Sequence, residues 1–399
     1  MTSSIAHAAF LLLAIGCLVG GRPAAAQAPS KSIRIVSFER ESDPFYDPVR
    51  LSDGIARVQH YRPFAGAELG IRDAAALGRT VGVTFQLERR SLPPEADLPA
   101  EIVRAEADGA SAILLDVPTS DISAAAKAVP DGRVPLFNVR DNDDALRRES
   151  CGTSLFHVIP SQTALTDALA QFVVRRNWRR VLVLVGPEEA DTTLARSFER
   201  SAKKFGARIV DTKPFVVGND PRNREQTNVV LMSNDSDFDV VFIADSARDF
   251  GRYVPYRLAR PRPVIGTEGL QAAAWNPASE RYGAPQVNSR FARTAGRPMS
   301  ELDWSAWVAT KAVAEAVTRA SASTGAEIVR ALSQGNLAIE MSKGVTGSFR
   351  PWDHQLRQPI MLHTANAVVE FAPLEGFLHE RTTLDTLGLT ENDIRCPSR

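Results

Sequence analysis

Residues 112–129 read AILLDVPTSDISAAAKAV, and this stretch decides the fold class. Its first six residues are almost all apolar and end at Val117, which is typical of a short strand buried on both faces of a parallel sheet. The next four residues, from Pro118 to Asp121, contain hydroxyl and carboxylate side chains of the kind that cap helices. From Ile122 to Val129 the apolar residues recur at helical spacing. A buried strand followed at once by a helix predicts the crossover unit of an α/β fold.

The same alternation extends along the chain in both directions and predicts two α/β units of similar size. Parallel strands joined by helical crossovers place helices on both faces of each sheet. For the first unit we expect strands at 33–38, 81–87, 112–117 and 134–139 and helices at 63–77, 98–107 and 122–129. For the second unit we expect helices at 164–175 and 194–205 and strands at 181–185, 208–213, 240–244 and 264–266. Helices at 304–320 and 326–332 and a hairpin of strands at 359–364 and 368–371 complete the expected order.

Residues 1–26 are predicted to be a secretory signal peptide. An apolar run from Ala8 to Val19 is followed by Ala24-Ala25-Ala26, which is a suitable cleavage site. The run is shorter than the roughly 20 residues that a membrane-spanning helix needs. We therefore expect an exported protein that is cleaved after Ala26, with lipid attachment at Cys17 as the alternative form of processing.

The cysteines that remain after cleavage are Cys151 and Cys396. A pair of cysteines in an oxidising compartment is usually bonded, so a disulfide is expected, and two unpaired thiols are the alternative. Neither the cysteines nor the six histidines of the chain have the spacing of metal ligands.

The charge balance and the absence of catalytic motifs exclude several classes of function. The chain has 47 basic and 47 acidic residues, which gives no electrostatic reason to expect a nucleic acid or an acidic membrane surface as partner. It lacks the G-x-S-x-G, H-E-x-x-H, phosphate-loop and dinucleotide motifs. We therefore expect a binding protein that is not an enzyme and has no cofactor.

The loops after the predicted strands are the candidate binding site, because open α/β sheets bind ligands beyond the carboxyl ends of their strands. These loops are rich in hydroxyl and acidic side chains, and helix capping or a solvated turn is the alternative explanation for each. The candidate ligand-binding residues are Thr119, Ser120, Asp141, Asn142, Asp191, Asp245 and Glu268.

Four segments resemble the periplasmic binding proteins of branched-chain amino-acid ABC transporters. They are FAGAELG at 64–70, HVIPS at 157–161, GTEG at 266–269 and GSF at 347–349, and the resemblance covers nearly all of the chain after residue 26. It implies a two-lobed type I periplasmic binding protein fold, in which each lobe is a mostly parallel sheet flanked by helices and the ligand cleft lies between the lobes. Lobe 1 would comprise 31–158 and 285–336, lobe 2 would comprise 159–284 and 337–372, and 373–399 would form a C-terminal extension.

A narrower resemblance is to the binding proteins found with PQQ-dependent alcohol dehydrogenase systems. It rests on DNDDALR at 141–147 with Cys151, DALAQ at 167–171, LRQPI at 356–360 and EGFLH at 375–379. Together the two resemblances imply a monomeric periplasmic protein that delivers a small ligand to an ABC permease of the inner membrane. The narrower one links that ligand to alcohol oxidation.

The resemblance carries over to the candidate site only in part. Glu268 stands where amino-acid binders have a glutamate that accepts the ligand's ammonium group, and Thr119 and Ser120 can match a loop that holds the ligand's carboxylate. Asp141-Asn142 replaces the Ala and Thr of the family pattern, and Ala190-Asp191 replaces a Tyr-Gly pair. A ligand carboxylate beside Asp141 would meet like charge. We therefore expect a cation, an amine or a polyhydroxylated or alcohol-derived ligand rather than a standard α-amino acid.

Three alternative functions remain open at this point. The chain could be a periplasmic sensor, or an accessory protein of an exported dehydrogenase. It could also bind calcium or a lanthanide ion, which needs six or more oxygen ligands around one point. Some of the oxygens could come from Asp141, Asp143, Asp144, Asp191 and Glu268 if the cleft brings the loops of both lobes together.

Overall fold

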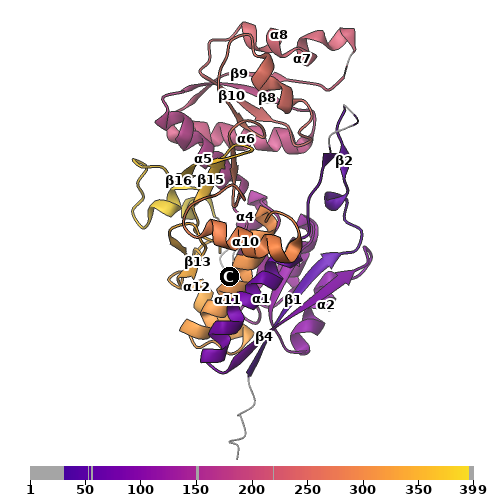
Figure 1. Cartoon of the computed structure of the whole chain (residues 1–399), viewed down its shortest axis with the longest axis vertical. Coiled ribbons are helices and arrows are strands. Elements are labelled where there is room, and N and C mark those ends of the chain that lie inside the picture. The colour runs from indigo at the N-terminus through magenta and orange to yellow at the C-terminus, as the bar shows by residue number, and fades with distance from the viewer. Residues whose placement is uncertain (1–30, 53, 55–56, 150–151, 219, 395–399) are drawn as a thin grey trace, which may run out of the picture. The chain divides into compact units, whose positions relative to one another are not determined.

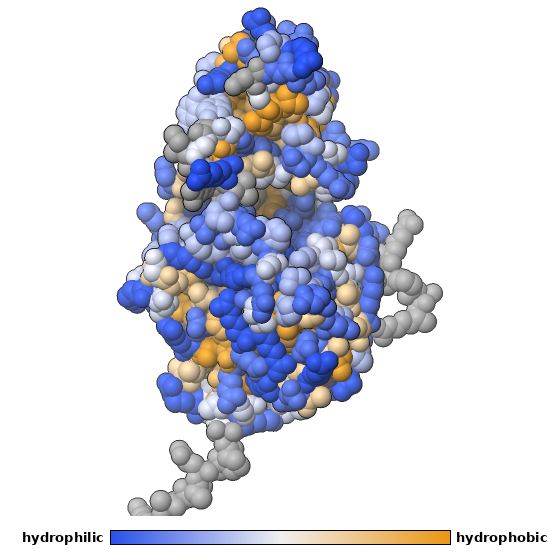
Figure 2. Space-filling view, turned by 90° about the vertical axis from the view of Figure 1, so that its right-hand side faces the viewer, coloured by the Kyte–Doolittle hydropathy of each residue, from blue (hydrophilic) through white to orange (hydrophobic). Residues whose placement is uncertain are grey.

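The computed structural model describes residues 31–394 except 53, 55–56, 150–151 and 219. The predicted signal peptide with Cys17, and the predicted disulfide partners Cys151 and Cys396, lie outside the described residues. In the part of the chain that is described, no helix is both long and apolar enough to cross a membrane. The face drawn in Figure 2 is largely hydrophilic, with hydrophobic residues in small separate patches.

The first sheet has five strands in the order β4-β1-β5-β6-β7, and every pair in it is parallel. All seven residues of the central strand β5 are buried, which is why its sequence is an apolar run rather than an alternation. The strands are β1 (Lys31–Arg40), β4 (Val83–Leu92), β5 (Ala110–Asp116), β6 (Leu136–Asn138) and β7 (Leu155–His157). The helices that connect them are α1 (Phe64–Thr80), α2 (Leu98–Ala107), α3 (Thr119–Ala128) and α4 (Asp144–Glu149) (Figure 1).

The second sheet has four parallel strands in the order β11-β10-β8-β9. The ring of Phe198 on α6 stacks on Phe242 of β10 at 3.9 Å, and this pair lies in the core between helix and sheet. The strands are β8 (Arg180–Val185), β9 (Arg208–Pro214), β10 (Val240–Ala244) and β11 (Val264–Gly266). The helices are α5 (Gln162–Arg175), α6 (Glu189–Phe205), α7 (Arg224–Thr227), α8 (Val229–Asn234) and α9 (Val254–Arg257).

The remaining strands are antiparallel. The predicted hairpin of β15 (Ile360–His363) and β16 (Val368–Ala372) is confirmed, and β12 (Gln271–Ala273), which the sequence does not predict, pairs with β15 to make a third sheet. Two short pairs are formed by β2 (Val49–Arg50) with β3 (Arg57–Val58) and by β13 (Ile339–Glu340) with β14 (Thr346–Gly347). The C-terminal helices are α10 (Ala284–Ala295), α11 (Glu301–Arg319) and α12 (Gly325–Ser333).

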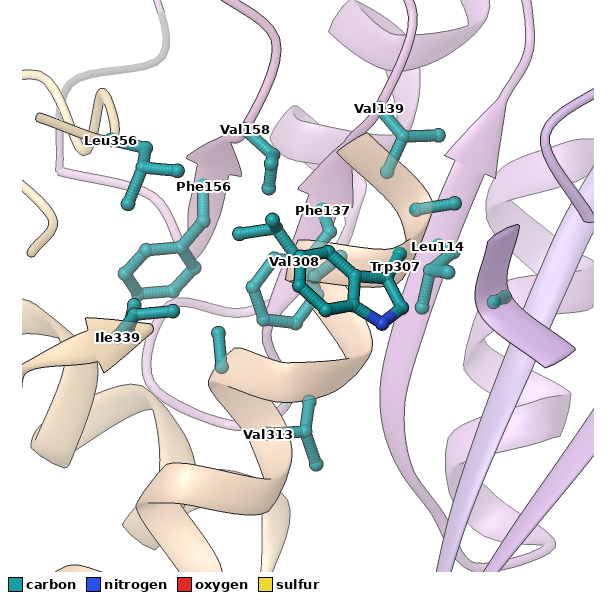
Figure 3. Packing of buried hydrophobic residues seen from close by; sticks show 14 of the residues in the cluster. Leu114, Phe137, Val139, Phe156, Val158, Trp307, Val308, Val313, Ile339 and Leu356 are labelled. Atoms are coloured by element: carbon teal, nitrogen blue, oxygen red, sulfur yellow. The ribbon is translucent and has the colours of Figure 1, made fainter. Parts of the chain in front are cut away.

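Helix α11 forms the centre of the largest core. Its Trp304 and Trp307 are fully buried. Figure 3 shows Trp307 and Val308 facing Leu114 of β5 and Phe137 of β6. Helix α1 approaches α11 so closely that a Cβ atom on its Gly66 would lie 1.9 Å from the backbone oxygen of Asp303. The small residues of the FAGAELG motif are therefore required by helix packing.

The C-terminal segment after β16 is attached by buried charged groups. Arg350 donates to the Asp385 carboxylate at 2.9 Å and to the backbone oxygen of Leu387 at 2.7 Å, and Arg357 donates to the same carboxylate at 2.8 Å. Lys204 of α6 bonds Asp167 of α5 at 2.7 Å and also reaches the backbone oxygen of Gly388 at 3.2 Å. Two of the motifs that suggest the PQQ-associated subgroup, DALAQ and LRQPI, therefore supply side chains that hold this segment.

Candidate ligand-binding site

A pocket of about 470 Å³ lies beyond the carboxyl ends of the first sheet's strands, where one loop of the second sheet also reaches it. Two segments that follow strands of the first sheet, together with the start of α11, form most of its wall. Arg248, from the loop after β10, completes it. The lining residues are Phe45, Gln59, His60 and Tyr61 between β1 and α1, Arg140, Asp141 and Asn142 after β6, Ser300, Glu301 and Leu302 at the start of α11, and Arg248.

The structure brings together three of the predicted site residues. Asp141 and Asn142 line the pocket, and the Thr119 hydroxyl donates a hydrogen bond to the Asp141 carboxylate. Thr119 is the first residue of α3 and Pro118 occupies the cap position, so its hydroxyl orients Asp141 instead of capping the helix. Ser120 is exposed on α3 and does not line this pocket.

A buried arginine fixes the loop that carries Asp141. Arg147 is 1% exposed and donates to the backbone oxygens of Asp141 and Asp143 at 2.8 Å each, and to that of Ile159 at 2.9 Å. The Asp141 amide also donates to the Asn138 side chain at 2.9 Å. Each oxygen of the Asp141 carboxylate accepts one hydrogen bond, from the Thr119 hydroxyl or from the Asp143 amide at 2.8 Å, and so keeps a further acceptor position.

The acidic residues after the second sheet's strands are placed differently. Asp191 is 1% exposed and accepts from the Glu188 amide at 3.2 Å and the Ser246 amide at 2.5 Å. Asp245 is equally buried and accepts from the Gly251 amide at 2.7 Å, and its burial raises the pKa of its carboxyl group. Both carboxylates therefore bond backbone amides of their own loops or of neighbouring ones. This is the capping role that the sequence analysis gave as the alternative to ligand binding.

Glu268 also lies outside the set of residues that line the pocket. Its carboxylate is half-buried and accepts from the Gly269 amide at 3.2 Å. Its Cβ atom would be 3.5 Å from a Cβ atom added to Gly251, so it sits beside the loop that Asp245 holds.

A buried ionic cluster holds Arg140, one of the residues that line the pocket. Arg140 pairs with Asp43 at 2.5 Å and with Asp116 at 3.5 Å, and its guanidinium lies 4.7 Å from the centre of the Phe45 ring. The Tyr46 hydroxyl donates to Asp116. Burial raises the pKa of the Asp116 carboxyl to about 6, although Tyr46 and the neighbouring arginines favour its charged form. Arg140 is thus committed to these carboxylates.

Arg248 differs from Arg140 in having no carboxylate partner among the described residues. It is exposed, and within the described part of the chain its guanidinium has neither a hydrogen bond nor an ion pair. Its backbone is left-handed, with φ at 54°. Its amide donates to the backbone oxygen of Asp245 at 3.1 Å. Its positive charge favours the ionised form of Glu301, whose pKa burial raises.

The aromatic part of the wall comes from the segment between β1 and α1. The His60 ring stacks on Phe45 with centroids 4.3 Å apart. Burial lowers the pKa of His60, and the positive charges of Arg248 and Arg140 lower it further, so its imidazole is neutral near pH 7. The pocket therefore presents a neutral ring, two carboxylates and one uncommitted guanidinium.

Several of these residues were not predicted from the sequence. Phe45, His60 and Tyr61 lie in a segment without strand or helix periodicity, and Glu301 lies at the start of a helix that was predicted to begin at Trp304. Arg140 and Arg248 each lie within three residues of a predicted site residue. A search of the same loops for cations as well as for acids would have found both.

The metal-binding alternative lacks the arrangement it needs. Among the described residues, no group of three or more His, Cys, Asp or Glu side chains is placed to hold a metal ion. Asp144 accepts from the Thr163 amide and hydroxyl, and Asp191 caps loops as described above. The carboxylates named for this alternative therefore do not come together around one point in this structure.

Comparisons with known proteins agree with the architecture. The family model for periplasmic binding proteins matches residues 64–254. A crystal structure of a leucine-, isoleucine-, valine-, threonine- and alanine-binding protein from Brucella ovis in a closed conformation superposes with a TM-score of 0.64, at 14% identity, over 92% of this chain and 97% of that chain. The chain has the type I periplasmic binding protein fold.

Two further solved structures have a similar fold. An ABC transporter substrate-binding protein from Desulfitobacterium hafniense in complex with Leu gives a TM-score of 0.62 at 19% identity, covering 86% of this chain and 100% of that chain. An ABC-type branched-chain amino-acid transporter protein from Rhodopseudomonas palustris gives 0.66 at 11% identity, covering 91% and 100%. No curated protein matches the sequence of this chain.

Proposed function

We propose that this protein is the solute-binding component of an ABC importer. It would capture a small ligand in the pocket of Asp141, Arg248 and Glu301 and deliver it to a permease in the inner membrane, as a monomeric periplasmic protein without enzymatic activity or cofactor. The observation that carries the proposal is that one pocket is lined both by loops of the first sheet and by a loop of the second. The fold, which binding proteins of such importers share, supports it.

The proposed mechanism is closure of two lobes around the ligand. A ligand that contacts both Asp141 and Arg248 stabilises the arrangement in which their loops are close together, because only that arrangement offers both contacts. A second link between the same two parts of the chain joins Ser52, after β2, to Asp249, next to Arg248, with two hydrogen bonds of 2.8 Å. The permease would recognise this closed form.

We further propose that the solute is connected with PQQ-dependent alcohol oxidation, and this part rests on the sequence motifs alone. The alternative functions are a periplasmic sensor and an accessory protein of an exported dehydrogenase. Neighbouring genes for a permease and an ATPase would favour import, and a neighbouring sensor kinase would favour sensing.

Thermal unfolding of the mature protein tests the central proposal. The panel contains amino acids, 2-hydroxy acids, alcohols, aldehydes, PQQ, calcium and a lanthanide. A solute that binds only the folded state raises the unfolding temperature increasingly with its concentration. A saturating rise with one class supports a solute-binding role, and Asp141→Asn should then weaken it whereas Ser120→Ala should not. A flat response to the whole panel would contradict the import proposal.

The predicted disulfide is also a proposal. Intact mass measured before and after reduction and without alkylation should differ by two hydrogens if Cys151 and Cys396 are bonded. An unchanged mass would establish two free thiols.

A further inference from the structure

The C-terminal segment after β16 encloses a second cavity, of about 260 Å³. It is lined by Trp352, in the turn before β15, and by residues of the segment 379–392. It shares no lining residue with the pocket of Asp141 and Arg248. We infer that this cavity is a separate binding site for a small neutral polyhydroxylated molecule, such as a monosaccharide or a sugar alcohol.

The first observation is a pair of buried polar atoms without hydrogen-bond partners. One is the indole nitrogen of Trp352, and the other is the Oδ2 oxygen of Asp385, a residue that is 3% exposed. In the described part of the chain only six side chains have a buried atom of this kind, and these two line the same cavity. Because folded proteins pair nearly all of their buried polar atoms, the two atoms indicate a bound molecule that pairs with both.

The second observation is that the surrounding structure holds both groups in place. The Oδ1 oxygen of Asp385 accepts from Arg350 at 2.9 Å and from Arg357 at 2.8 Å, which fixes the carboxylate and leaves Oδ2 unused. The guanidiniums of Arg350, Arg357 and Arg381 lie 5.1 to 5.4 Å from the centre of the Trp352 ring, where cation–π attraction fixes the indole. Donor and acceptor are therefore preorganised at one cavity.

The third observation identifies the chemical group that fits. The indole N–H of Trp352 only donates and Oδ2 of Asp385 only accepts, and a hydroxyl group can accept from the first and donate to the second. A carboxylate only accepts and an ammonium group only donates, so neither satisfies both atoms. The guanidinium that lines the cavity is already paired, since Arg381 bonds Glu391 at 2.7 Å. An anion would therefore find no free cation there among the described residues.

The rim and the size of the cavity favour several hydroxyls on one small molecule. Glu380 and Asn392 are exposed side chains of the lining and offer further acceptors and donors. Pockets for drug-sized ligands measure roughly 300 to 1,000 Å³, so this smaller cavity suits a molecule of monosaccharide size or below. A single ordered water, which also donates and accepts, is the competing occupant.

NMR of the mature protein with isotope-labelled tryptophan tests the site. The chain has five tryptophans, each with one indole N–H signal, and Trp352→Phe identifies the signal of Trp352. We expect D-glucose, myo-inositol or glycerol to shift this signal saturably and to leave that of Trp178, which does not line the cavity, in place. Tetrahydropyran, acetate, methylammonium and glycine should not shift it, because none of them carries a hydroxyl group.

Calorimetry with the polyol that gives the largest shift measures the role of the indole N–H. Trp352→Phe keeps an aromatic ring but removes the donor, and we expect the affinity to fall about tenfold, the effect of one hydrogen bond. Trp178→Phe is the matched control, and its affinity should equal that of the wild type. The unfolding temperature of both variants shows whether each one is folded.

Two results would overturn the inference. A Trp352 signal that none of the polyols shifts would mean that water alone occupies the cavity. A shift with acetate, methylammonium or glycine but not with a polyol, or equal polyol affinity in the folded Trp352→Phe variant, would show that the assigned chemistry is wrong. The importer proposal would stand in each case, because it rests on a pocket with a different set of lining residues.

Discussion

The loops after the first sheet and the loops after the second sheet contain similar residues and use them differently. Asp141 follows β6, is partly exposed and lines the pocket, although it too accepts from a backbone amide, that of Asp143 at 2.8 Å. Asp191 and Asp245 follow β8 and β10, are each 1% exposed, and accept from backbone amides away from the pocket. The difference is burial. A carboxylate removed from water must have its oxygens hydrogen-bonded, and the amides of the adjacent turn are the nearest donors. An acidic residue at the end of a strand is therefore available to a ligand only where it remains partly exposed.

Removal of a buried carboxylate of the second sheet should produce the largest effect. Asp191→Ala leaves the Glu188 and Ser246 amides without their acceptor, and we expect a loss of about 3 kcal/mol in the free energy of unfolding. Urea unfolding measures it. A loss below about 0.5 kcal/mol would mean that Asp191 does not stabilise the fold. The acidic residues after the two sheets would then not differ in their structural role.

The titration of Asp116 should produce the next largest effect. Its folded-state pKa of about 6 lies above the ordinary value of 3.8, so the folded protein retains a proton that the unfolded chain releases. The stability that this group contributes is greatest below about pH 4 and falls as the pH rises through 6, by about 2 to 3 kcal/mol. Asp116→Asn should flatten this part of the stability profile in urea unfolding between pH 4 and 7. An identical slope in the variant would contradict the assignment.

Substitution of Asp141 should affect binding more than stability. Asp141→Asn keeps the size of the side chain but removes its charge, and we expect about a tenfold loss of affinity for the ligand identified by thermal shift, with the free energy of unfolding changed by less than about 1 kcal/mol. Calorimetry and urea unfolding together measure both quantities. Loss of stability without loss of affinity would show that Asp141, like Asp191, stabilises its loop and does not bind the ligand.

The smallest effects are expected from the predicted site residues that do not line the pocket. Ser120→Ala and Glu268→Gln should each change stability by less than about 0.5 kcal/mol and leave affinity unchanged. A loss of affinity in Glu268→Gln would show that this residue reaches the ligand in another arrangement of the loops, as the family resemblance implies.

The long elements were predictable because both of their ends carry local signals. Helix α2 lies where the sequence predicts it. The shorter strands β10 and β11 do so too, because each is an apolar run. Helix α6 begins at Glu189, five residues before its predicted start at Leu194, because Glu188 and Asp191 form a capping box in a stretch whose residues are polar. Strands β7 and β12 and helix α4 were missed because they are short and contain polar residues, so they lack the apolar run that marks β10 and β11.

By itself, the sequence determined the alternation of strands and helices, the two parallel sheets and the loops in which a ligand site should lie, because these depend on local periodicity and on the geometry of parallel strands. Only the tertiary structure decided which side chains face the pocket. Phe45, Asp141, Arg248 and Glu301 come from four distant segments, and whether each carboxylate or guanidinium is free depends on partners that no local pattern specifies. That dependence on distant partners is the physical reason that the acids of the loops were predicted as ligands while Arg248 was overlooked.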